Sequence, residues 1–112
     1  MENSNDSSYF KRRKLVVFQV LENLMVLNLH GCFNLAAVPD LSGHQALEKL
    51  GLERCDKLTK IHESVGSLSS LLHLNVRDCS NLIELPSDIS GLKKLESLFL
   101  SGCSKMKELP ES

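Results

Sequence analysis

One pattern of leucines recurs four times along this chain of 112 residues. Each copy reads L-x-x-L-x-(L/V)-x-x-C-x-x-(L/M)-x-x-(V/I/L), and Pro follows in every copy except the second, where His62 takes its place. The copies begin at Leu24, Leu47, Leu71 and Leu95, so they start 23 or 24 residues apart. A fixed period of this length restricts the chain to architectures in which one structural unit is stacked on the next.

Each copy predicts a short strand followed by a turn and a return segment. The stretch x-L-x-L-x alternates, so its leucines share one face of a strand, and stacked copies would form a parallel sheet with strands about 4.8 Å apart. The return is short and rich in Ser and Gly, so we expect 3₁₀ turns or one short helical turn per repeat. The predicted fold class is therefore an α/β repeat solenoid of the leucine-rich repeat type. It would have about four repeats, a concave parallel β-sheet and a convex side of 3₁₀ turns or short helices.

The chain divides into three parts. Residues 1–14 are polar and end in a basic cluster, and they predict a disordered tail. Residues 15–23 are apolar and are interpreted as a degenerate first turn or an N-terminal cap. Residues 24–112 hold the repeats. Because the fourth repeat is not followed by a polar capping repeat, we expect the array to be incomplete at its C-terminus and the chain to be a fragment.

Every repeat carries one cysteine at the same offset. These are Cys32, Cys55, Cys79 and Cys103. A structural zinc site needs pairs spaced by two to four residues, and such pairs are missing here. We therefore predict a structural ladder of buried, unreactive thiols at the junction of strand and turn.

The residues between the strand leucines would line the concave face of the sheet. We regard seven of them as candidate partner contacts: His30, Lys49, Glu53, His73, Asn75, Arg77 and Phe99. The charged members of this set are expected to be solvated, and the phenylalanine is expected to be an exposed aromatic side chain.

This set of side chains predicts binding and no catalysis. His30 and His73 would lie about 10 Å apart, too far to share a metal ion without other ligands. No P-loop motif is present, so no nucleotide or other cofactor is expected in this chain. The sequence therefore indicates a protein that is not an enzyme.

Net charge and hydropathy limit the kinds of partner and the cellular location that can be expected. The net charge of -1 gives no reason to expect nucleic acid, whose binding proteins concentrate positive charge. No apolar run approaches the roughly 18 residues of a membrane span, and the N-terminus lacks the apolar region of a secretory signal. We expect a cytoplasmic chain, with the nucleus as an alternative if the basic cluster at residues 11–14 acts as an import signal.

Four stretches carry a resemblance to a known family. They are Leu24–Cys32 (LMVLNLHGC), Leu58–Gly66 (LTKIHESVG), Cys79–Gly91 (CSNLIELPSDISG) and Ser101–Ser112 (SGCSKMKELPES). These resemble the repeats of plant intracellular disease-resistance proteins, the nucleotide-binding leucine-rich repeat (NLR) immune receptors. The likeness is closest to those with a Toll/interleukin-1-receptor domain, the TIR-NBS-LRR type, and it covers about residues 21–112.

The resemblance implies a role in plant innate immunity. In that family the repeats sense a pathogen effector or its host target, and they make autoinhibitory contacts with the receptor's own nucleotide-binding domain. ADP and ATP would bind only in that domain, which this chain lacks. Only the recognition of a protein partner is therefore carried over.

Two other repeat proteins remain as alternatives. An extracellular leucine-rich repeat receptor would favour Asn where this chain has Cys, and it would need a signal peptide. A substrate-binding subunit of a ubiquitin ligase would show an I-T-D-like turn after its Cys. Here the four cysteines are followed by FN, DK, SN and SK.

Overall fold

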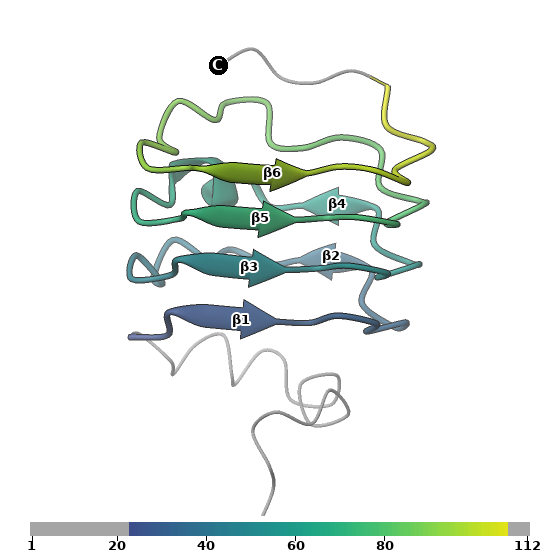
Figure 1. The fold of residues 1–112 in the computed structure, drawn as a ribbon, viewed down its shortest axis with the longest axis horizontal. Helices are drawn as coiled ribbons and strands as arrows, with labels where there is room; N and C mark the ends of the chain where they lie inside the picture. Colours follow the sequence, from purple (N-terminus) through teal and green to yellow (C-terminus); the bar gives the residue numbers. More distant parts are fainter. Residues whose placement is uncertain (1–22, 108–112) are drawn as a thin grey trace, which may run out of the picture.

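The computed structural model of the protein describes residues 23–107. The tail predicted at 1–14, nearly all of the segment at 15–23 and the end of the fourth repeat lie outside these residues. The described part contains a four-stranded parallel sheet whose strands follow one another in the order β1-β3-β5-β6 (Figure 1). These strands are Val26–Asn28, Lys49–Gly51, His73–Asn75 and Ser97–Phe99.

The sheet aligns the same position of every repeat. Leu27 pairs with Leu50, Leu50 with Leu74 and Leu74 with Leu98, so the middle residues of the four strands form one row. The first three are at most 2% exposed, and Leu98 at the end of the row is half-buried. The alternation that the sequence predicts is therefore present, with the row of leucines directed into the core.

A second, smaller parallel sheet was not predicted. It consists of β2 (Ala37–Val38) and β4 (Lys60–Ile61), which lie behind the larger sheet in the view of Figure 1. In both strands the first residue is exposed and the second is buried. Two-residue strands are too short to show a periodic signal, so the repeat pattern alone could not reveal them.

One apolar core joins the repeats. The leucines of the strands, the cysteines and the apolar residues of the returns form a single cluster of buried side chains. In the return segments, Leu41 and Val65 are completely buried, whereas Ile89 is half-buried. Because the repeats share this one cluster of buried side chains, much of the stability is expected to arise between neighbouring repeats.

The return segments differ from the expectation of one helical turn in each repeat. In the described residues, only the second return forms a helix, the 3₁₀ helix η1 (Glu63–Ser67). The backbone N–H of Ser64 donates to Nδ1 of His62 at the start of this helix. In the first and third returns, Asp40 and Asp88 instead accept hydrogen bonds from the backbone N–H two residues later, at 2.8 and 2.9 Å. These local turns compete with helix formation.

The length of the helices decides whether any of them could cross a membrane. The helix η1 has five residues. Within residues 23–107, no helix is both long enough and apolar enough to cross a bilayer.

The residue before each cysteine adopts a left-handed backbone conformation. Its φ is +71° at Gly31, +61° at Arg54, +59° at Asp78 and +84° at Gly102. At the first three of these positions the backbone N–H donates to a carbonyl oxygen of the next repeat, at 2.8 to 2.9 Å. The turn that leads into the cysteine is thus the same in all four repeats, although only two of them supply glycine, the residue that adopts this conformation without strain.

Candidate functional site

The four-stranded sheet has one face toward the core and one face directed away from it, which we call the open face. The open face carries three rows of side chains: the first residues of the strands, the third residues, and the residues two positions further on. All seven candidate contact residues lie in these rows: His30, Lys49, Glu53, His73, Asn75, Arg77 and Phe99.

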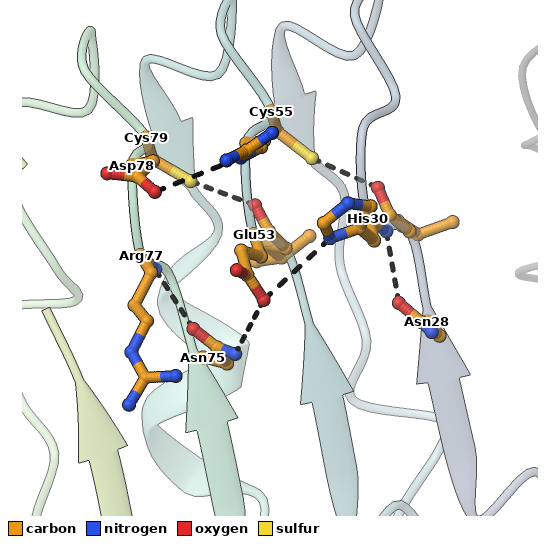
Figure 2. Close-up of polar contacts among 11 residues, drawn as sticks. Asn28, His30, Glu53, Cys55, Asn75, Arg77, Asp78 and Cys79 are labelled. Carbon is orange, nitrogen blue, oxygen red and sulfur yellow. Dashed lines mark hydrogen bonds and ion pairs between the residues drawn. The ribbon is translucent and has the colours of Figure 1, made fainter. Parts of the chain in front are cut away.

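Glu53 is the centre of a polar cluster on the open face. Asn75 Nδ2 donates a hydrogen bond to Glu53 Oε1 at 3.2 Å, and His30 Nδ1 lies 3.7 Å from the same oxygen (Figure 2). The Glu53 side chain is 32% exposed. Solvent reaches this side chain, as expected, but neighbouring strands also bring an amide and an imidazole to its carboxylate, which the sequence did not predict.

Arg77 and Phe99 form a second pair. The guanidinium carbon of Arg77 lies 4.1 Å from the centre of the Phe99 ring, and both residues are half-buried. The predictions of a solvated arginine and an exposed aromatic ring are both wrong, because each side chain covers the other through a cation–π contact. Lys49, by contrast, is exposed and has no ion pair in the described part of the chain.

Two asparagines fix the chain as it leaves its strand. Asn28 Oδ1 accepts from the backbone N–H of His30 at 3.1 Å, and Asn75 Oδ1 accepts from that of Arg77 at 3.0 Å. These Asx-type turns set the direction of the third row of side chains. The recurring N-x-(H/R) at the two positions could have indicated this turn, but the sequence placed both asparagines only on the concave face.

A depression lies between the asparagines. At the third strand position, Asn28 and Asn75 pair in register with Gly51, which has no side chain. The depression has a volume of about 370 Å³. Residues of the first three strands, the side chains that follow two of these strands, and Phe99 of the fourth strand border it. They are Val26, Leu27, Asn28, His30, Lys49, Leu50, Gly51, Glu53, His73, Asn75 and Phe99.

In Figure 2, Cys55 and Cys79 of the cysteine ladder lie beside residues of the open face, and both are buried. Cys55 Sγ donates to the Leu29 carbonyl at 3.2 Å, and Cys79 Sγ donates to the Leu52 carbonyl at 2.9 Å. Desolvation on burial raises the pKa of Cys55 to about 12 and that of Cys79 to about 11. Thiols with such pKa values are protonated at neutral pH, so they are poor nucleophiles and poor metal ligands.

The ladder is not uniform at its two ends. Cys32 is buried, and Cys103 is half-buried, with its Sγ donating to the Val76 carbonyl at 3.0 Å. Burial also raises the pKa of the Cys103 thiol. None of these four cysteines, all of which lie within residues 23–107, forms a disulfide.

A Ser-His-Asp cluster on the return segments does not form a catalytic relay. Ser64 Oγ lies 3.0 Å and Asp40 Oδ1 lies 4.0 Å from the same atom, Nδ1 of His62. A relay needs the acid and the nucleophile on opposite nitrogens of the imidazole. Within residues 23–107, no group of three or more His, Cys, Asp or Glu side chains is arranged to hold a metal ion.

One buried polar residue was not predicted from the sequence. His44 is only 4% exposed and occupies the position that Leu68 and Leu92 hold in the next two repeats. Its backbone keeps the same turn, since its N–H donates to Leu41 and its carbonyl accepts from Leu47. The leucine pattern carries no signal for a histidine at this position.

No family model matches the chain, and no solved structure matches it. Function is therefore inferred from the repeat pattern and from the geometry of the open face.

Proposed function

We propose that this chain is a leucine-rich repeat module that recognises a protein partner in plant innate immunity, as part of an intracellular receptor of the TIR-NBS-LRR type. The observation that carries the proposal is the in-register stacking of four strands. Their leucines are directed into one core, while their variable residues stand together on the open face. The inward-facing leucines of the strands are thus the same in every repeat while the residues of the open face vary, as expected for a module that recognises a partner.

Several side chains of the open face are already held in place. Glu53 is fixed by Asn75 and lies close to His30, and Arg77 is stacked on Phe99. Binding loses less conformational entropy when the contacting side chains are ordered in advance. Aromatic and arginine side chains are also those that contribute most at protein interfaces. These features favour the open face as the surface that meets the partner.

The partner in this proposal is a pathogen effector, a host target of an effector, or the nucleotide-binding domain of the same receptor. The chain would act in the cytoplasm by binding alone, with no cofactor of its own. Nucleotide exchange belongs to another domain of the receptor.

The experiment is a two-hybrid screen of this chain against pathogen effectors and against nucleotide-binding domains of plant receptors. Every partner found is then tested with the double variant R77A/F99A, which removes the stacked pair from the open face. The matched control is K60A on the exposed side of β4, in the other sheet. We expect the double variant to lose binding and the control to keep it. Partners that bind R77A/F99A as well as the wild type would contradict the proposal.

A further inference from the structure

The depression over Gly51 has the form of a pocket for one side chain. Its floor is the glycine, and its walls are Asn28 and Asn75, which pair with that glycine from either side. A Cβ atom at position 51 would lie 3.1 Å from Asn28 Oδ1, so even a methyl group would begin to fill the space. Glycine weakens a strand interior and often marks a place where another chain approaches closely.

The carboxylate of Glu53 borders this depression with one oxygen still available. Its contacts with Asn75 and His30 both use Oε1 (Figure 2). Within residues 23–107, Oε2 accepts no hydrogen bond. An ionised carboxylate can accept about four hydrogen bonds. A donor that enters the depression could therefore bind to Oε2 of Glu53, whose side chain is already held in place by Asn75.

Lys49, the one lysine or arginine that borders the depression, does not cancel that preference. The Cα atoms of Lys49 and Glu53 are about 13 Å apart along an extended strand, and the two side chains form no ion pair within residues 23–107. Lys49 is exposed to solvent. Charges separated by more than about 8 Å are largely screened at physiological ionic strength. Because the Lys49 ammonium is in solvent and forms no ion pair with Glu53, a cation in contact with the carboxylate would be attracted by it more strongly than it is repelled by Lys49.

The apolar residues that border the depression could contact the methylene groups of a long side chain. Val26 is 53% exposed at one side of the depression, and Phe99 borders another. Arginine covers apolar surface with its methylene groups while its guanidinium remains hydrogen-bonded. Its planar fork also offers five donors, enough for both Glu53 Oε2 and Asn28 Oδ1, whereas the ammonium of lysine is a point charge.

We propose that the depression over Gly51 binds an arginine side chain of the protein partner, through the carboxylate of Glu53 and the amide oxygen of Asn28. This inference rests on the proposed function, because it identifies which feature of a protein partner the open face selects. It makes Gly51 a specificity-determining position: a larger residue there would close the pocket without disturbing the core.

The test is a titration of the full chain, followed by NMR of its backbone amides. The probe is N-acetyl-arginine amide, and the matched neutral probe is N-acetyl-citrulline amide, which has nearly the same shape without the charge. We expect the arginine probe to shift the amides of Asn28, Gly51 and Asn75 with a dissociation constant on the order of 10 mM, and the citrulline probe to bind at least about tenfold more weakly.

Three variants complete the test. G51V fills the depression and E53Q removes its charge, so both should abolish the shifts. E84Q removes the same charge from an exposed position in the third repeat, outside the depression, and should leave the shifts unchanged. The spectrum of each variant, away from the depression, verifies that it is folded.

The proposal is overturned if the arginine probe causes no shifts up to about 100 mM, or if citrulline binds equally well. It is also overturned if E53Q binds like the wild type, or if N-acetyl-glutamate amide occupies the same site through Lys49 and His73. The two proposals can fail separately. A partner that depends on Arg77 and Phe99, but ignores G51V and E53Q, would uphold recognition by the open face and reject the arginine pocket.

Discussion

The thiol of Cys79 donates a hydrogen bond to the carbonyl oxygen of Leu52 at 2.9 Å, across one full repeat. The same carbonyl also accepts the backbone N–H of Cys55, at 3.2 Å. One oxygen therefore joins two consecutive members of the cysteine ladder. Because the accepting oxygen belongs to the preceding repeat, the thiol contributes to the interface between repeats as well as to the core.

The first prediction concerns the order in which the thiols react. A thiol-specific reagent applied to the native protein at neutral pH should label Cys103 before Cys55 and Cys79. The reason is that Cys103 is half-buried, whereas the other two are buried and their raised pKa values keep them protonated. Mass spectrometry of the labelled peptides gives the order, and unfolding in urea should abolish it. Rapid labelling of Cys55 or Cys79 in the native state would contradict the buried ladder.

The same pKa values predict a loss of stability in alkali. An unfolded thiol ionises near its ordinary pKa of 9.0, while the folded state keeps Cys79 protonated to about 11 and Cys55 to about 12. Between these limits the unfolded state binds fewer protons, so the free energy of unfolding falls as the pH rises. It should fall by up to about 1.4 kcal/mol per pH unit for each thiol.

Urea unfolding at several pH values between 8 and 10.5 measures this slope. The double variant C55A/C79A is the control, because its other titrating groups are unchanged. Its slope should be smaller than that of the wild type, and equal slopes would show that the two thiols are not responsible.

The row of strand leucines gives the third prediction. Leu74 is 2% exposed and pairs with Leu50 and Leu98, so L74D would bring an unpaired charge into the core. We expect a loss of about 4 kcal/mol or more, enough to unfold the array. The matched control is H73D, which introduces the same residue one position earlier, on the open face. Circular dichroism and urea unfolding would compare them, and a cooperatively folded L74D would show that this residue does not face the core.

The sequence predicted what repeats and missed what does not. Leu27, Leu50 and Leu74 could be assigned to the core because an alternating pattern fixes the face of a strand before any contact is known. The contact of Arg77 with Phe99 could not be predicted, because it depends on the register between neighbouring strands and on rotamers. The same limit applies to Glu53, whose environment is supplied by side chains of two other repeats.

The backbone, too, has features that the sequence predicts and features that it does not. The turn before each cysteine occurs in all four repeats, yet only Gly31 and Gly102 give a sign of its left-handed conformation. Arg54 and Asp78 adopt it because the surrounding hydrogen bonds impose it, and neither residue type reveals this alone. Local propensity is overruled wherever stacking fixes the chain on both sides.

The fourth prediction tests the contact between return segments. A Cβ atom at Gly66 would overlap the backbone carbonyl oxygen of Asp88, which belongs to the next repeat. Backbone cannot move aside as the tip of a side chain can, so G66A should cost about 2 kcal/mol or more. Gly43 lies in the first return with open space around its Cβ position, and G43A should be neutral or stabilising by up to about 1 kcal/mol. Equal midpoints of urea unfolding for the two variants would contradict the close approach of the returns.

The last prediction uses the left-handed turn. Arg54 has a φ of +61° and an exposed side chain that is 4.0 Å from Asp78. A non-glycine residue in this conformation costs about 1–2 kcal/mol, while an exposed ion pair contributes at most about 1 kcal/mol. The strain is the larger effect, so R54G should raise the free energy of unfolding by up to about 1 kcal/mol. Gly31 has the same turn with open space around it, so G31A should lower the free energy of unfolding by a similar amount. Thermal and urea unfolding of both variants measure the two changes, and changes of the same sign would show that backbone strain does not control this turn.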